Sequence, residues 1–202
     1  MSGAERPEWV VREDASAGVL VALYLRQALG IRAPEELPHL RGAPAAASAD
    51  DDAAQLLQRQ WLAYWALSVE PQAHPSPVPL ELVDGFETLA VLPVDGFDEL
   101  RSAITPFAAE AVTYARRASE RYALQARTGS SSSYRAYASA IAEHERRVGR
   151  RAHSFELNVQ VLPLTQRGVW WIGSLTVAVT DGLRGDVASF DPAIQPIIAE
   201  LA

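Results

Sequence analysis

The sequence predicts an α+β fold, with about four strands in two antiparallel hairpins that pack against four or five helices. Two segments, residues 80–92 and 154–180, alternate apolar and polar residues in the way that half-buried strands do. The other apolar segments repeat their apolar residues at helical spacing. Because the strands come in sequence-adjacent pairs, rather than alternating singly with helices, a parallel dinucleotide-binding sheet is not expected.

The N-terminal third predicts two helices. The first begins after Asp14, a residue suited to a helix N-terminus, and ends at Leu29, where Gly30 follows in the position of a terminating glycine. The second follows three aspartates, whose charges favour a helix start, and ends near Val69. Its aromatic side chains are expected in the core, and they are Trp61, Tyr64 and Trp65.

A proline-rich stretch at residues 71–79 predicts a stiff, extended connector. It is the only candidate for an internal domain boundary. Two helices before it would make a poor core by themselves, so we expect one domain that covers residues 1–202.

The tetrapeptide Val-Asp-Gly-Phe occurs twice in the middle of the chain. At its first copy, Asp84-Gly85 separates two apolar runs, which is the pattern of a tight β-hairpin between residues 80 and 92. At its second copy, Asp95 precedes apolar residues at helical spacing and therefore predicts a helix start.

Residues 105–148 predict a helical hairpin, with a break at Gly129 and the four serines that follow it. The serine-rich tip could be a flexible connector. Alternatively, backbone amides at the start of the second helix, hydroxyl groups and flanking guanidinium groups could bind an anion. The residues of this candidate anion site are Arg127, Ser132, Ser133 and Arg135.

Residues 154–180 predict the second hairpin, formed by a strand at 155–161 and a longer strand at 169–180. Near Trp170 and Ile172 both faces of the second strand are apolar. That end of the strand is therefore either covered on both sides or exposed for a partner.

Charge is distributed unevenly along the chain. The net charge is −7, but residues 105–153 carry nine Arg against four Glu, a local balance of +5, and the rest of the chain has a balance of −12. The positively charged helices are therefore expected to dock onto an acidic surface, either the protein's own or that of a second subunit.

These features favour a non-catalytic interaction or regulatory protein that self-associates or binds a protein partner. Its expected surface combines arginines of the helical hairpin with an aromatic patch, namely Arg116, Arg117, Arg146, Arg147, Arg150, Arg151 and Trp170. The alternative is a small enzyme or ligand-binding protein with a pocket between sheet and helices. Its candidate polar groups are His144, Glu145, Arg147 and His153.

The sequence lacks residues that several kinds of functional site require. There is no Cys, so disulfides, thiolate nucleophiles and Cys-based metal sites are excluded, and every basic residue is Arg, so a Schiff-base lysine is excluded too. The usual nucleotide-binding and hydrolase motifs are absent, and we expect no cofactor and no metal. The acidic net charge argues against nucleic acid. The N-terminal apolar run is too short for a membrane span and lacks a positive flank, so we expect a cytoplasmic protein without membrane contact.

Overall fold

A computed structural model describes residues 8–47 and 52–202, except for the side chains at 128–134. The described strands form a four-stranded mixed sheet and a separate two-stranded sheet. The larger sheet contains, in spatial order, β1 (Trp9–Asp14), β4 (Phe155–Leu162), β6 (Thr176–Thr180) and β5 (Val169–Trp171). The smaller sheet pairs β2 (Leu80–Leu82) with β3 (Val91–Pro93).

Six α-helices are present in the described residues. They are α1 (Ala17–Ala28), α2 (Asp52–Val69), α3 (Asp98–Ile104), α4 (Ala108–Val148), α5 (Asp181–Arg184) and α6 (Val187–Leu201), and a 3₁₀ turn (Thr105–Phe107) joins α3 to α4. The molecule is α+β, but the predicted arrangement of two antiparallel hairpins and four or five helices is wrong.

The predicted hairpin at 154–180 is replaced by a mixed arrangement. β4 does alternate buried and exposed residues, as expected, but it pairs in parallel with β6. The connection at 163–168 carries the chain past the position of β6 to β5, and β5 then returns to β6 through a short turn as an antiparallel pair. β6 therefore lies between two other strands, and all five of its residues are buried.

β1 was not predicted. Its sequence carries three charged residues in a row after Val11, which hides the strand pattern, and its partner lies far along the chain. β1 pairs in parallel with β4, so that Trp9 lies opposite Phe155 and Asp14 lies opposite Gln160. A pairing over such a sequence distance leaves no local signal, and Asp14 ends a strand instead of beginning a helix.

The smaller sheet lies within the predicted 80–92 segment, but Asp84-Gly85 is not a two-residue hairpin turn. The antiparallel strands β2 and β3 have three residues each, and residues 83–90 between them form consecutive turns. Two residues there, Gly85 and Glu87, adopt positive φ. The turns place Phe86 in the core with no exposed surface.

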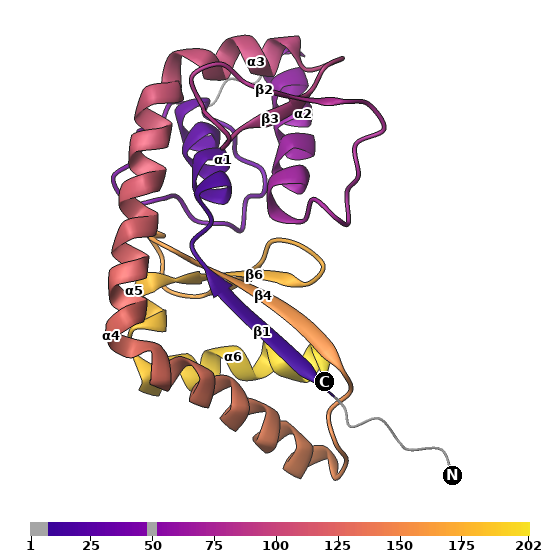
Figure 1. Cartoon of the computed structure of the whole chain (residues 1–202), viewed down its shortest axis with the longest axis vertical. Coiled ribbons are helices and arrows are strands. Elements are labelled where there is room, and N and C mark those ends of the chain that lie inside the picture. Colours follow the sequence, from indigo (N-terminus) through magenta and orange to yellow (C-terminus); the bar gives the residue numbers. More distant parts are fainter. Residues whose placement is uncertain (1–7, 48–51) are drawn as a thin grey trace.

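The predicted helical hairpin at 105–148 is a single helix. The backbone of α4 remains helical through Gly129 and the serines, and it ends at Gly149, whose φ is 69° and whose N–H donates to the carbonyl of Glu145. The first part of α4 packs on α1 and the last part packs on α6, so tertiary contacts on both sides outweigh the weak helix propensity of the middle. Figure 1 shows α4 along one side of the molecule, bending in its lower part.

Two hydrophobic clusters make up the core. The first core joins α1, α2, α3, the start of α4 and the loop between β2 and β3, together with Leu162 of β4 and Ala178 of β6. The second core joins β4, β6, the last part of α4 and α6. Figure 1 shows the two groups of elements at opposite ends of the molecule, with α4 beside both of them. The expectation of a single domain over residues 1–202, with 71–79 as an irregular connector, stays a prediction.

Candidate functional site

An open hollow of about 430 Å³ lies at the C-terminal end of α4, where the sequence places its densest group of arginines. Its lining residues come from the last turns of the helix and from the segment that follows: Ala142, Glu145, Arg146, Gly149, Arg150 and Arg151. Three residues of the predicted interaction surface, Arg146, Arg150 and Arg151, line this hollow.

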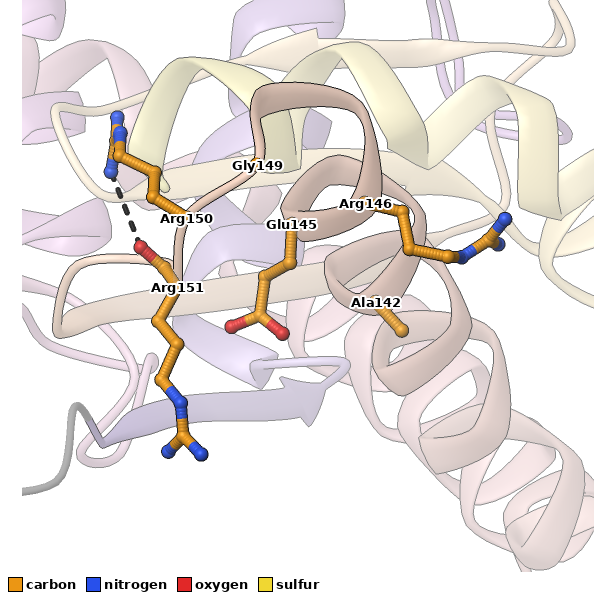
Figure 2. A pocket seen from close by; sticks show the side chains of 6 residues that line it. All are labelled: Ala142, Glu145, Arg146, Gly149, Arg150 and Arg151. Atoms are coloured by element: carbon orange, nitrogen blue, oxygen red, sulfur yellow. Dashed lines mark hydrogen bonds between the residues drawn. The ribbon is translucent and has the colours of Figure 1, made fainter.

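The three guanidinium groups of this hollow do not converge. In Figure 2 the side chains of Arg146 and Arg151 point away from each other, and the carboxylate of Glu145 lies between them. Glu145 accepts a hydrogen bond of 2.9 Å from the backbone N–H of Ala152, while Arg150 donates to the carbonyl of Arg151 at 3.3 Å. Small-anion sites aim their donors at one point. The arrangement here suits a broad acidic surface better.

The two histidines of the alternative hypothesis do not share a site. His144 is buried on the inner side of α4, and its Nδ1 lies 3.4 Å from a guanidinium nitrogen of Arg147. His153 is exposed, and its backbone N–H donates to the carbonyl of Ala202. In the described part of the chain no three His, Asp or Glu side chains are grouped as metal ligands would be.

A second cationic region runs along the outer side of α4, upstream of the hollow. Arg117, Arg121, Leu124 and Arg127 are all exposed and recur at spacings of four and three residues, which places them on one side of the helix. We call these four residues the cationic face of α4. Leu124 is 62% exposed, the highest value among the exposed large apolar residues.

The arginines of the cationic face are not neutralised by the described residues. No carboxylate in the described regions forms an ion pair with Arg117, Arg121 or Arg127. Neighbouring Arg116 pairs with Glu87, and Arg146 pairs with Glu143 of its own helix. The acids in the described regions therefore leave the positive charge of the cationic face without an ion-pair partner.

Because α4 is continuous, the helix start on which the candidate anion site depends is missing. Arg127 and Arg135 are both exposed, but they are separated by two helical turns, about 12 Å along the axis. No second helix begins between them, so the backbone amides that the anion site needs are committed to the helix. The side chains of Ser132 and Ser133 lie outside the described residues.

The exposed aromatic residue differs from the one selected from the sequence. Trp170 is half-buried and packs against the first core, next to Gly168, where an added Cβ would lie 2.8 Å from the indole ring. Trp171 is 37% exposed instead, and its indole N–H donates to Glu200 of α6 at 2.8 Å. Successive residues of a strand point to opposite faces, so the alternation could have distinguished the two.

A cluster of polar residues that the sequence analysis missed joins β1, α4 and α5. The carboxylate of Glu13 accepts hydrogen bonds from the hydroxyl of Tyr137, at 2.7 Å, and from Nη2 of Arg184, at 3.1 Å. Burial and the nearby Glu13 raise the pKa of Tyr137. The guanidinium of Arg184 also lies 4.9 Å from the centre of the Phe190 ring. Every charge has a partner within the chain, which is typical of a structural cluster.

No family model, curated protein or solved structure matches this chain. In addition, no helix in the described regions combines the length and apolar character needed to cross a membrane.

Proposed function

We propose that this chain is a non-catalytic interaction protein that docks the cationic face of α4 onto an acidic protein surface. The observation that carries this proposal is the absence of ion pairs with described acids at Arg117, Arg121 and Arg127, around the exposed Leu124. Charged groups at such a surface steer association and select a partner of opposite charge, while an apolar residue at its centre adds burial.

The first partner to test is a second copy of the chain. Outside residues 105–153 the sequence has a balance of −12, so each copy offers both a cationic face and acidic surface to another. Exposed ion pairs each contribute only about 0.2–1 kcal/mol and are screened by salt, so the association should be moderate and sensitive to ionic strength.

The observations give the enzyme hypothesis less support. The exposed His153 and the buried His144 face different surroundings, and the hollow beside them has diverging cations around a carboxylate. A nucleic-acid partner would use the same arginines, but the net charge of −7 opposes it.

Light scattering of the purified chain tests the proposal. At low salt we expect a molar mass above the monomer value of 21.9 kDa, and at high salt we expect the monomer. The double variant Arg117→Glu/Arg121→Glu should be monomeric in both conditions, because it reverses the charge of the face. The matched variant Arg59→Glu, on an exposed position of α2, should behave like the wild type.

A binding assay with labelled poly-glutamate tests for an acidic partner other than a second copy of the chain. We expect the wild type to bind it and the double variant to bind about tenfold more weakly or not at all. A wild type that is monomeric at low salt and also fails to bind poly-glutamate would contradict the proposal. Tighter binding of a DNA duplex than of poly-glutamate would contradict it as well.

A further inference from the structure

The two outer edges of the small β2–β3 sheet differ. In an antiparallel pair, facing residues alternate between those that exchange backbone hydrogen bonds and those whose backbone groups point outward. Val83 donates to Ala90 at 3.0 Å and Val94 donates to Pro79 at 3.1 Å. Positions 79 and 83 therefore point toward β3, and the backbone groups of Leu80 and Leu82 point away from it.

The outer edge of β3 is protected at Pro93. Pro93 lies opposite Leu80 and has no N–H to offer, and its carbonyl accepts a hydrogen bond of 3.4 Å from Arg101. Proline on an outer strand is a common protection against pairing with another chain. β2 contains no proline, and its Leu80 and Leu82 are 46% and 51% exposed.

The exposed apolar face of β2 continues into a groove. Facing residues of a sheet project to the same side, so Leu80 shares its side with Pro93, which lines an apolar groove of about 610 Å³. The groove lies between α2, the proline-rich loop and the start of the next helix. Its other walls include Leu67, Pro77, Val78 and Phe97, together with the carboxylate-bearing Asp95.

The charge around the outer edge of β2 determines which kind of segment can bind there. Residues 71–104 carry six acids and one Arg, a balance of −5; that Arg lies 3.6 Å from Glu81, and Arg116 of α4 pairs with Glu87. A cationic segment is favoured here. A second copy of β2 is disfavoured, because pairing Leu80 with Leu82 of the other copy would place the two Glu81 side chains directly opposite each other.

We propose that the outer edge of β2 accepts an extended segment of a partner protein as an added strand, with apolar residues at alternate positions and flanking Arg or Lys. Main-chain hydrogen bonds to Leu80 and Leu82 supply the pairing, and the apolar face and groove select the side chains. This surface lies on a different element from the cationic face of α4, so it extends the proposed function to a second, oppositely charged docking site.

Selection from a displayed library of short peptides on the immobilised full-length chain tests this inference. We expect enrichment of sequences that alternate apolar and polar residues between Arg or Lys. A synthetic peptide of the enriched sequence should bind the wild type in solution, and the same peptide with N-methyl groups on its alternate amides should bind about tenfold more weakly or not at all. Failure to enrich such sequences, or equal binding of the N-methylated peptide, would overturn the inference.

The variant Leu82→Pro removes an outward N–H without removing a bond between β2 and β3. We expect its affinity for the peptide to fall about tenfold, with an unchanged melting temperature. Leu124→Asp, on the cationic face of α4, should bind the peptide normally, which separates this site from the proposed function. A wild-type dimer that Leu82→Pro converts to a monomer would show that a second copy occupies the edge and would overturn the inference.

Discussion

Replacing Arg26 with alanine is expected to lower the free energy of unfolding by about 3–5 kcal/mol. Arg26 is 2% exposed, and its guanidinium donates hydrogen bonds to the carbonyls of Leu37, Arg32 and Pro34 at 2.7–2.8 Å. These carbonyls belong to the irregular segment that covers α1. Without the guanidinium, the carbonyls of Leu37 and Arg32 would lose this donor, the carbonyl of Pro34 would keep the N–H of Leu37, and a cavity would remain beside them.

Burial lowers the pKa of Arg26 to about 10, so the side chain is still cationic at neutral pH. A buried cation without a carboxylate needs partners for its donors, and here backbone carbonyls accept from Nη1 and Nη2 of Arg26, while Nε is buried without a partner. Arg26→Lys keeps the charge but not the planar set of donors, so it should recover only part of the lost stability.

Urea unfolding followed by circular dichroism measures this effect as a lower midpoint with an unchanged slope. Arg59→Ala, at an exposed position of α2, is the matched control and should change the free energy of unfolding by less than about 0.5 kcal/mol. Equal stability of Arg26→Ala and the control would show that the segment at 30–46 does not depend on this guanidinium.

Replacing Glu70 with glutamine is expected to lower the free energy of unfolding by about 2–3 kcal/mol, somewhat less than the Arg26 substitution. Glu70 follows α2, and its carboxylate accepts four hydrogen bonds from the turn between β5 and β6. The donors are the N–H and hydroxyl of Ser174, the N–H of Leu175 and the hydroxyl of Thr176, at 2.8–3.0 Å. The amide of glutamine would turn a donor toward some of them.

The same contact predicts acid sensitivity. Burial raises the pKa of Glu70, but the hydrogen bonds from Leu175, Thr176 and Ser174 outweigh it and hold the pKa below its ordinary value. A carboxyl with a depressed pKa in the folded state stabilises the protein above its unfolded-state pKa, and this stabilisation is lost as the pH falls through the folded-state value. The stability difference between wild type and Glu70→Gln should therefore shrink below about pH 4.

Gly173 gives an independent test of the same contact. A Cβ at this position would lie 2.5 Å from Cδ of Glu70, so Gly173→Ala should displace the carboxylate from its four donors and lower the melting temperature. Gly182→Ala is the matched glycine control, because nothing lies within 4 Å of its added Cβ. If both alanine variants melt like the wild type, Glu70 does not hold the β5–β6 turn in place.

Local patterns predicted the local structure of this chain. The aromatic residues of α2 are buried as expected, since Trp61, Tyr64 and Trp65 are each at most 6% exposed. The alternation at 155–161 forms β4, and Gly30 follows α1 with positive φ. Each of these outcomes depends on side chains within a few residues of one another.

Errors arose where distant segments decide the structure. β1 exists because β4 pairs with it across most of the chain, and α4 continues through its serines because α1 and α6 hold its two parts. The contacts of Glu70 with Ser174 and of Glu13 with Arg184 also join residues more than 100 positions apart. Glu70 therefore had no local pattern that marked it as buried, whereas the carbonyls that bind Arg26 lie only 6 to 11 residues along the chain. The clustering of arginines was visible in the sequence, because it depends only on the positions of these residues along the chain.

A site-specific fluorescence measurement shows whether partners bind at the cationic face of α4. The chain has no Cys, so Leu124→Cys creates a single attachment point for an environment-sensitive dye in the middle of that face. Val187→Cys, at a 44% exposed position of α6, provides the matched control. Unlabelled wild type and poly-glutamate are then added separately at low salt.

We expect the dye emission at position 124 to change on addition of at least one of these two binders and to return to its starting value at high salt. The dye at position 187 should not respond. No change at position 124 with either binder, or an equal change at both positions, would contradict the account.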